Sequence, residues 1–437
     1  MSSVQAVTLE KIVSLCKRRG FVYPSAEIYS GLNGVYDFGP LGALLKENIK
    51  NAWLEHMSSF PEEVVLVDGA ILGAPEVWKA SGHVDNFSDP LVDCLACKKR
   101  FRADEFKLED GCPNCGAKSW TDVRQFKLMF QTQVGAVADA SSIAYLRPET
   151  AQSIFINFKN VISSYRVKIP FGIAQIGKAF RNEITPKQFL FRVREFEQME
   201  MEFFCKGEDA DKFFDLWVAR RQEFFKSVGL TSENVRIRPH EKEELAHYAK
   251  GCFDVEYNFP FGWKELEGIA NRSNFDLMQH SKFSGKELAV FDEETKSSYV
   301  PHVVECSVGV GRLLLALLFD AYHEDIVENE PRIVLRLHPK VAPISAAILP
   351  LTNKLKEQSE KVFFDLKNHG FKIQYDTSGS IGKRYRRQDE IGTPVCFTFD
   401  FESLEDGMVT ARNRDTLQQE RVAIDKLPEY LNKLIGK

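Results

Sequence analysis

The chain has 437 residues, of which 44% are hydrophobic and 27% charged, and its formal net charge is −5 at pH 7. This length supports two or three hydrophobic cores, and the composition excludes a largely disordered protein. The longest apolar run, Leu313–Phe319, is far shorter than the roughly 20 residues that cross a bilayer, and the slightly negative charge requires any nucleic-acid partner to use a local basic surface.

The N-terminal region predicts one helix, a glycine-rich loop and a longer helix. It lacks the basic start and apolar stretch of a secretory signal, so we expect a cytoplasmic protein without a membrane span. Thr8 is a suitable cap for a helix that Gly20 would end. Glycines and a proline are concentrated in residues 31–42, and apolar residues from Leu44 to Trp53 then recur at helical spacing.

Residues 90–120 form a cysteine-rich insert with two Cys-x-x-Cys pairs. The pairs are Cys94–Cys97 and Cys112–Cys115, and the second carries the proline and glycine typical of zinc knuckles. Four thiolates in two tight turns complete a tetrahedral shell, which predicts a structural Zn²⁺ site and a reducing compartment. The alternative is four unliganded thiols, but this polar, basic insert offers no core to bury them.

The middle of the chain alternates polar and apolar residues as strands do. Residues 171–205 predict an antiparallel hairpin with a polar turn at 185–188, and 208–229 predict a helix. Residues 303–322 predict a short strand, a Gly-x-Gly break and a very apolar helix. After Pro339, strand candidates at 344–349, 371–375 and 395–399 alternate with helices, so we expect a domain boundary within 331–343.

Three segments together carry a family resemblance. Gly39-Pro40 before the long helix, Phe180-Arg181-Asn182-Glu183 with the run from Phe191 to Glu200, and Glu305 to Arg312 resemble the three signature motifs of class II aminoacyl-tRNA synthetases. The stretches Arg147–Gln152 and Glu265–Arg272 add a closer resemblance to the dimeric glycyl-tRNA synthetase family, from residue 8 to the C-terminus. This resemblance implies an α+β fold, with an antiparallel-sheet catalytic domain at 1–335 that contains the zinc-knuckle insert, and a C-terminal mixed α/β anticodon-binding domain at 340–437.

The resemblance also implies how ATP would be bound. Amino-acid activation brings a carboxylate to the α-phosphorus of ATP, and fixed guanidinium groups stabilise the two anions that meet. Arg181, Glu183 and Arg312 are the expected catalytic residues, Phe196 would stack on adenine, and Glu265 and Glu305 would position Mg²⁺. The full expected ATP site is Arg181, Asn182, Glu183, Phe191, Arg192, Val193, Arg194, Glu195, Phe196, Glu265, Leu266, Gly309, Val310, Gly311 and Arg312.

A glycine pocket has to bind an ammonium group and exclude every side chain. Acidic residues meet both needs, and Glu149, Glu200 and Glu305 with Ser307 resemble the glycine site of the family. Excluding larger substrates is a steric task, unlike recognition of a missing methylene. The expected glycine site is Arg102, Glu149, Phe196, Glu197, Gln198, Met199, Glu200, Glu305 and Ser307, although Arg102 is equally compatible with a solvated basic face.

The expected partners are ATP, glycine, tRNA(Gly) and a second copy of the chain. Lys383, Arg384, Arg386 and Arg387 form the densest basic cluster, and Tyr385 lies among them, as in surfaces that bind phosphates and unstacked bases. The alternative for this cluster is a solvated face.

Three functional alternatives remain open at this point. They are a synthetase for another small amino acid, a catalytically silent nucleic-acid-binding relative, and a zinc that takes part in amino-acid recognition. Taken singly, Arg181–Glu183 could be the end of a surface strand, and Gly309–Gly311 a tight turn before a buried helix.

Overall fold

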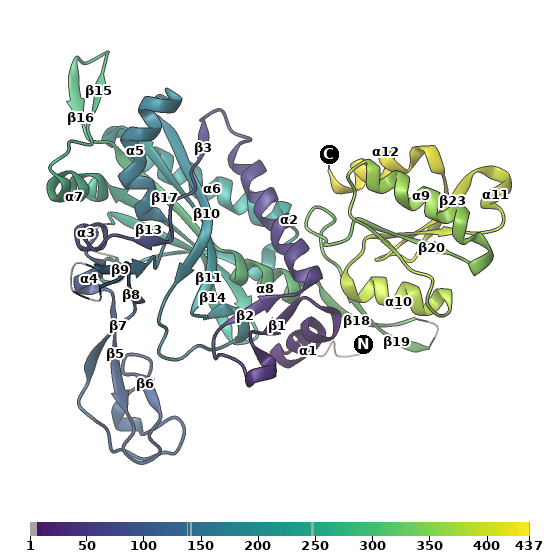
Figure 1. The fold of residues 1–437 in the computed structure, drawn as a ribbon, viewed down its shortest axis with the longest axis horizontal. Helices are drawn as coiled ribbons and strands as arrows, with labels where there is room; N and C mark the ends of the chain where they lie inside the picture. Colours follow the sequence, from purple (N-terminus) through teal and green to yellow (C-terminus); the bar gives the residue numbers. More distant parts are fainter. Residues whose placement is uncertain (1–6, 138, 140–141, 246–248, 328, 437) are drawn as a thin grey trace.

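The computed structural model describes residues 7–137, 139, 142–245, 249–327 and 329–436. Figure 1 shows a larger body built around a long twisted sheet and a smaller C-terminal body built around a second sheet. A small cysteine-rich lobe projects from the larger body. Within the described residues, no helix is both long enough and apolar enough to cross a membrane.

The first helix forms as its end signals predict. Helix α1 spans Leu9–Arg19, and the Thr8 side chain accepts a hydrogen bond from the backbone N–H of Lys11. Gly20 ends the helix with φ of 76°, a left-handed conformation that glycine adopts without strain. The second predicted helix is also confirmed: α2 spans Pro40–Met57 and begins with its proline in the first turn.

The large sheet has seven strands in the order β12-β13-β14-β17-β11-β10-β3. All neighbours pair antiparallel except β3 and β10, which are parallel. The strands are β3 (Val64–Leu66), β10 (Phe171–Phe180), β11 (Glu195–Cys205), β12 (Val235–Pro239), β13 (Gly251–Phe259), β14 (Gly262–Ser273) and β17 (His302–Gly309).

The predicted hairpin at 171–205 is present, but its second strand begins later than the alternation suggested. β10 and β11 pair from Phe171↔Phe204 to Phe180↔Glu195. The connection contains a 3₁₀ turn at Phe189–Phe191, and Lys187 pairs with Arg192 in an isolated bridge. The basic residues just before β11 therefore lie in a structured loop, where they are not confined to the two faces of a strand.

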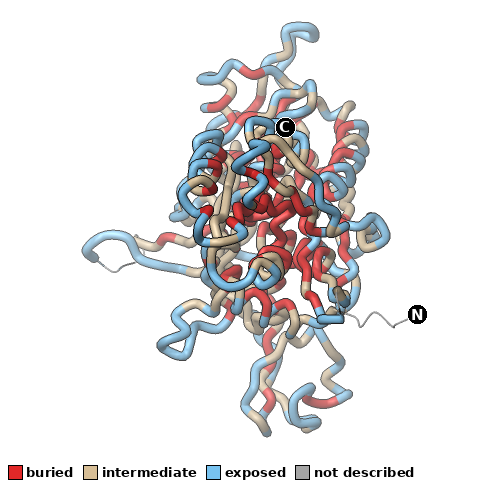
Figure 2. The backbone as a smooth tube through the Cα atoms, turned by 90° about the vertical axis from the view of Figure 1, so that its right-hand side faces the viewer, coloured by how far each residue is buried: buried red, intermediate tan, exposed pale blue. Residues whose placement is uncertain are grey.

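The two faces of the sheet are covered differently, and this difference leaves room for a site. One face packs against α2, α6 (Ala210–Ser227) and α8 (Val310–Ala321) in the main hydrophobic core. On the other face, a second core joins only one end of the strands to α5 (Ala151–Tyr165) and α7 (Phe275–Ser284). Figure 2 shows the buried residues gathered in the middle of the molecule and exposed loops at its periphery.

The cysteine-rich insert and the C-terminal sheet are separate small units. The insert is the sheet β6-β5-β7, formed by Arg100–Arg102, Ser88–Asp93 and Arg124–Lys127. The C-terminal sheet has the order β21-β20-β22-β23-β24, with β21, β20 and β22 parallel and the last two pairings antiparallel. Its elements are β20 (Ala346–Pro350), α9 (Lys356–Asn368), β21 (Ile373–Tyr375), α10 (Ile381–Ile391), β22 (Val395–Phe399), α11 (Ser403–Asp406), β23 (Met408–Asn413), β24 (Gln419–Ala423) and α12 (Leu427–Ile435).

A hairpin connects the large sheet to the C-terminal unit. It consists of β18 (Tyr322–Val327) and β19 (Glu330–Leu335), and β19 packs on α10. The buried Arg332 of β19 donates to Asp389 of α10 at 3.3 Å and to the Arg414 carbonyl at 3.0 Å. The remaining elements are β1 (Val22–Pro24), β2 (Tyr36–Phe38), β4 (Leu72–Gly73), α3 (Pro75–Ala80), α4 (His83–Asn86), β8 (Gln131–Gln133), β9 (Ile143–Leu146), β15 (Val290–Asp292) and β16 (Ser297–Tyr299).

Candidate active site

A polar cleft lies on the partly uncovered face of the large sheet, at the Gly309 end of β17. It has about 700 Å³ of empty space, part of it open to solvent. Its walls come from the β10–β11 connection, β14, and the junction of β17 with α8. The lining residues are Arg181, Glu183, Leu190, Phe191, Arg192, Val193, Phe196, Gln198, Glu265, Leu266, Ser307, Gly309, Gly311 and Arg312.

Arg181 follows the last residue of β10 and is held between two aromatic rings. Its guanidinium carbon lies 5.4 Å from the centre of the Phe87 ring and 5.3 Å from that of Phe196. Its Nε donates to the Pro148 carbonyl at 3.1 Å. These contacts fix the plane of the guanidinium group while its remaining N–H groups can bind an anion in the cleft.

Arg312 lies in the first turn of α8 on another wall of the cleft. Its Nη1 lies 3.1 Å from a carboxylate oxygen of Glu265, and its Nε donates to the Phe191 carbonyl at 3.2 Å. The charge of Arg312 is the main cause that lowers the pKa of Glu265, with a smaller contribution from Arg181. The positive charges of Arg312 and Arg181 therefore both act on the Glu265 carboxylate. This is consistent with the position of both guanidinium groups on the lining of one cleft.

Eleven of the fifteen expected ATP residues line this cleft, and four do not. Arg194 points away: its Nε donates to the Glu183 carbonyl at 3.2 Å and its Nη1 to the Asn33 carbonyl at 2.5 Å. Glu195 pairs with Lys178 at 2.6 Å beside the cleft. Val310 is fully buried in the main core at the start of α8, and the backbone N–H of Asn182 donates to the Leu128 carbonyl.

Behind the cleft, Glu200 is a buried carboxylate surrounded by donors. It accepts hydrogen bonds from the Thr150 backbone N–H at 2.8 Å, the Thr150 hydroxyl, the Ser307 hydroxyl at 2.7 Å and the Gln198 amide at 2.9 Å. Ser307 is its partner in the β11–β17 register. Burial raises the pKa of Glu200, the charge of Glu149 adds to this effect, and the Thr150 and Ser307 hydrogen bonds oppose it.

Two further carboxylates converge on Glu200. Glu149 lies 3.2 Å from the His83 Nε2 and accepts a hydrogen bond from Gln152 at 2.9 Å. Its burial would raise its pKa, but His83 and the other donors outweigh burial and hold the pKa well below its usual value. For Glu305, burial, reinforced by Glu200 and Glu149 and opposed by Arg272, raises the pKa to about 7.

The structure adds Arg272, which the sequence analysis quoted only as the end of a motif. This buried residue donates from Nη1 to Glu305 at 3.0 Å and from Nε and Nη2 to Asp276 at 2.8 and 2.9 Å. A single arginine at the end of a strand gives no local sign of such a role. Only the fold brings it to Glu305, so sequence patterns could not have assigned it.

Two of the expected glycine residues point away from the pocket, which corrects the prediction. Glu197 forms ion pairs with Lys46 at 2.6 Å and Lys50 at 3.3 Å, both on α2. Met199 is fully buried in the main core on the same side. The reason is strand geometry: alternate residues of β11 project to opposite faces, so Phe196, Gln198 and Glu200 share the site face and Glu197 and Met199 cannot.

Arg102 lies in β6 of the insert, outside the residues that line the cleft. It pairs with Asp89 at 2.8 Å and with Asp104 at 2.7 Å. The insert contacts the cleft wall through Glu105, which pairs with Lys187 at 2.7 Å and with Arg192 at 2.6 Å. Because acids of its own lobe occupy Arg102, a contact with the amino acid would need this lobe to rearrange.

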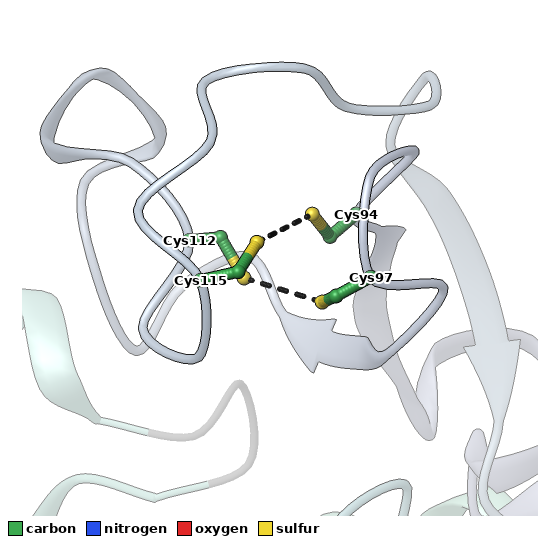
Figure 3. Close-up of side chains that lie close together, drawn as sticks. All are labelled: Cys94, Cys97, Cys112 and Cys115. Carbon is green, nitrogen blue, oxygen red and sulfur yellow. Dashed lines mark hydrogen bonds between the residues drawn. The ribbon is translucent and has the colours of Figure 1, made fainter.

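The four predicted zinc ligands face one another (Figure 3). The Sγ atoms of Cys94 and Cys115 are 3.7 Å apart, as are those of Cys97 and Cys112, and all four lie within 4.8 Å of one another. A tetrahedral Zn²⁺ shell with Zn–S bonds of about 2.3 Å has S···S edges of about 3.8 Å. The donor set and its spacing therefore fit a structural zinc.

The basic cluster of α10 is largely occupied within the protein. Arg384 is buried, and its Nη1 donates to the carbonyls of Pro350 at 2.6 Å and Asp376 at 3.2 Å. Its expected contact with tRNA is therefore wrong for this conformation, because a buried guanidinium bound to carbonyls cannot reach phosphate. Arg387 pairs with Asp376 at 2.7 Å and Arg386 donates to the Val327 carbonyl, whereas Lys383 is exposed.

Comparisons with known proteins identify two regions of the chain and its relatives. A family model described as the tRNA synthetase class II core domain (G, H, P, S and T) matches residues 136–321, and one described as an anticodon binding domain matches residues 345–434. The chain is 52% identical to a glycine–tRNA ligase of Alkaliphilus oremlandii, over 97% of this chain and 98% of the relative. It is 49% identical to that of Geobacillus thermodenitrificans (99% and 98% covered) and 52% identical to that of Borreliella burgdorferi strain ATCC 35210 (97% of each).

Proposed function

The chain belongs to the glycine–tRNA ligase family of class II aminoacyl-tRNA synthetases, and from this premise we propose that it joins glycine to the 3′ end of tRNA(Gly) through a glycyl-adenylate. The predicted fold class is confirmed by the class II core and anticodon-binding matches. In the first step, the glycine carboxylate attacks the α-phosphorus of ATP and pyrophosphate leaves. In the second, the terminal ribose hydroxyl of tRNA attacks the adenylate carbonyl and AMP leaves.

The observation that carries the proposal is the position of Arg181 and Arg312 on one cleft beside a buried group of carboxylates. Two anions must approach each other in the activation step, and fixed guanidinium groups stabilise the charge that they share. Positioning and electrostatics account for the rate, so no covalent enzyme intermediate is needed.

Each cleft residue has a proposed role that its surroundings support. Arg181 would bind the α-phosphate and the incoming carboxylate, because two rings and the Pro148 carbonyl hold its guanidinium plane. Arg312 would bind the γ-phosphate at the Gly309 end of the cleft. Phe196 would stack on adenine, and Glu183 would contact the adenine side of the nucleotide.

Selection of glycine would rest on the carboxylates behind the cleft. Glu149, Glu200 and Glu305 attract the ammonium group, and Ser307 completes this wall. All three carboxylates are held by donors, so none can turn aside to make room for a substrate side chain. Exclusion of alanine is then a steric effect, which discriminates more strongly than recognition of a missing methylene.

Mg²⁺ would accompany ATP and neutralise charge on its phosphates. Glu265 fits this ion, because its carboxylate is half exposed at the cleft and carboxylate oxygens are hard ligands. Glu305 fits less well, because one of its oxygens is bound to Arg272 and it does not line the cleft. Zn²⁺ on the four cysteines would stabilise the insert, whose Glu105 contacts the cleft wall.

For tRNA and self-association, the structure offers surfaces that support the proposal. Lys383 is exposed on α10 within the region matched by the anticodon-binding family. Ile28, Tyr29 and Leu32 are 88%, 81% and 61% exposed in the segment that precedes α2. Large exposed apolar side chains favour an interface, so we propose a homodimer, to be checked by sedimentation velocity. A role in translation would place the protein in the cytoplasm.

Amino-acid-dependent ATP–pyrophosphate exchange tests the reaction. We expect exchange with glycine and at most traces with alanine, serine, threonine or proline. Exchange that prefers another amino acid would indicate a synthetase of different specificity. Tight tRNA binding without exchange for any of the twenty amino acids would indicate a silent nucleic-acid-binding relative, and either result would overturn the proposal.

A further inference from the structure

Glu202 is a fully buried carboxyl group to which the mechanism above gives no task. It lies two residues after Glu200 on β11, so both side chains project to the site face of the sheet. Both of its carboxyl oxygens are buried, and neither has a hydrogen-bond partner among the described residues. A buried polar group without a partner is costly and therefore calls for an explanation.

The strand register places Glu202 directly opposite Glu305. The two residues are Cα partners in the antiparallel β11–β17 pairing, where side chains on one face lie about 5 Å apart at Cβ. Two ionised carboxylates in adjacent buried positions repel each other strongly. One member of such a pair is therefore expected to keep its proton.

The charged groups around Glu202 indicate which member keeps the proton. It faces Glu305 of β17, Arg272 of β14, Asp276 of α7 and Glu200 of its own strand. The hydrogen bond from Arg272 to Glu305 opposes the rise in the pKa of Glu305 that burial causes, whereas the carboxyl oxygens of Glu202 have no such donor among the described residues. Burial is the main cause that raises the pKa of Glu202 well above its usual value, and Glu305 is the next.

We propose, on the basis of the function inferred above, that Glu202 is a positioning residue for glycine binding that acts as a neutral carboxylic acid and directs Glu305 toward the substrate ammonium. Its O–H group is the hydrogen-bond donor for the Oε1 atom of Glu305. Arg272 holds Oε2, and among the described residues no donor contacts Oε1. With both oxygens held, Glu305 keeps one orientation and presents a single negative charge to the pocket.

Such a device suits a substrate without a side chain. Glycine offers only its ammonium and carboxylate for recognition, so the orientation of a few carboxylates determines both affinity and fit. If Glu202 were ionised, it would repel Glu305 and compete for Arg272, and the carboxylate that faces the ammonium would lose its fixed position.

Two substitutions of similar size separate positioning from simple core packing. Glu202→Gln keeps a neutral side chain with an N–H donor, and Glu202→Leu keeps the volume but removes the donor. Glycine-dependent pyrophosphate exchange of the full-length zinc-loaded protein gives kcat, the KM for glycine and the KM for ATP, and thermal unfolding gives stability.

We expect Glu202→Gln to keep a glycine KM within about threefold of the wild type, because it preserves a neutral donor. We expect Glu202→Leu to raise the glycine KM about tenfold or more, as the loss of one hydrogen bond to a charged group does, while kcat and the KM for ATP change less than about threefold. Its unfolding temperature should stay close to that of the wild type, because the removal of a buried polar group offsets the loss of its hydrogen bond to Glu305.

The outcomes separate this inference from the proposed function. A wild-type protein without glycine-dependent exchange overturns both. If the wild type is active and the glycine KM of Glu202→Leu lies within about twofold of the wild-type value, the inference alone is overturned. The inference is also overturned if the glycine KM of Glu202→Gln rises as much as that of Glu202→Leu. If Glu202→Leu fails to fold, Glu202→Ala takes its place, and an unchanged glycine KM in that variant overturns the inference.

Discussion

Glu265 and Arg312 form an ion pair of 3.1 Å at the candidate nucleotide cleft, one from β14 and the other from the first turn of α8. The pair joins the strand that carries Glu265 to the helix that follows β17. Because Arg312 also donates to the Phe191 carbonyl, its guanidinium is directed by two separate segments before any ligand arrives.

Removing the charge of Glu265 should therefore weaken ATP binding. In Glu265→Gln, Arg312 loses its carboxylate partner and the cleft loses an oxygen ligand for Mg²⁺, so we expect the KM for ATP to rise about tenfold or more. The KM for glycine should change much less, since the carboxylates behind the cleft are untouched. Pyrophosphate exchange at varied ATP and Mg²⁺ concentrations measures both, and an unchanged KM for ATP would contradict the assignment.

Arg181→Ala should abolish activation while leaving the fold intact. Arg181 is the cation nearest the proposed meeting point of the two anions, and loss of such a group costs on the order of 10²- to 10³-fold in rate. Exchange kinetics measure the loss, and circular dichroism verifies the fold. Arg100→Ala, at an exposed arginine of the insert, is the matched control and should remain active. Near-normal exchange in the Arg181 variant would refute the role.

Glycine binding should weaken as pH falls through about 7. The pKa of Glu305 is raised to about 7, chiefly by burial and then by Glu200 and Glu149 against the opposing charge of Arg272. Below that pH the carboxyl is neutral and attracts the ammonium less, so the glycine KM should rise by up to about tenfold per pH unit. Measurements of the KM from pH 6 to 8.5 test this sign. Glu305→Gln should bind glycine weakly, with no break near pH 7.

The insert should hold one Zn²⁺ per chain and lose its fold without it. In Cys112→Ser the tetrahedral shell is incomplete, so we expect loss of the metal and rapid proteolysis between residues 94 and 115. Metal analysis and limited proteolysis measure these effects, and Cys16→Ala, at a buried cysteine outside the insert, should retain full zinc. A zinc that recognises the amino acid would instead change the glycine KM while the insert stays folded.

Substitutions at two neighbouring residues of α10, Arg384 and Lys383, should affect different properties: the first the stability of the fold, and the second the affinity for tRNA. Arg384→Ala leaves the Pro350 and Asp376 carbonyls without their buried donor, so we expect a loss of stability of about 2–3 kcal/mol with little specific effect on tRNA. Lys383→Ala should leave the unfolding temperature unchanged and weaken tRNA binding at low salt by a few fold. Thermal unfolding and filter binding measure the two effects, and the reverse pattern would contradict this division.

Structural features that depend on residues close together in the chain could be predicted from the sequence. The Thr8 and Gly20 signals place the ends of α1, and the two Cys-x-x-Cys pairs lie with their sulfur atoms at the spacing of a zinc shell. The face of each β11 residue also follows from alternation. The assignments of Glu197 and Met199 to the glycine site were wrong because they ignored that period, although the strand itself was predicted.

Other features depended on segments that are far apart in the sequence. Nothing near Arg272 indicates that it will meet Glu305. The cluster of four basic residues around Tyr385 likewise does not reveal that Arg384 is buried and donates to two carbonyls. Glu202 likewise became informative only through its register opposite Glu305.

The sequence alone therefore determined the ends of the first helix, the hairpin at 171–205, the metal-ligand spacing and the family motifs, because backbone propensity and periodicity act over a few residues. The tertiary structure decided which charges are buried, which are paired and which remain available to a ligand. The free energy of a charged side chain depends on the solvent and the partners that distant strands bring to it, and these exist only once the sheet has assembled.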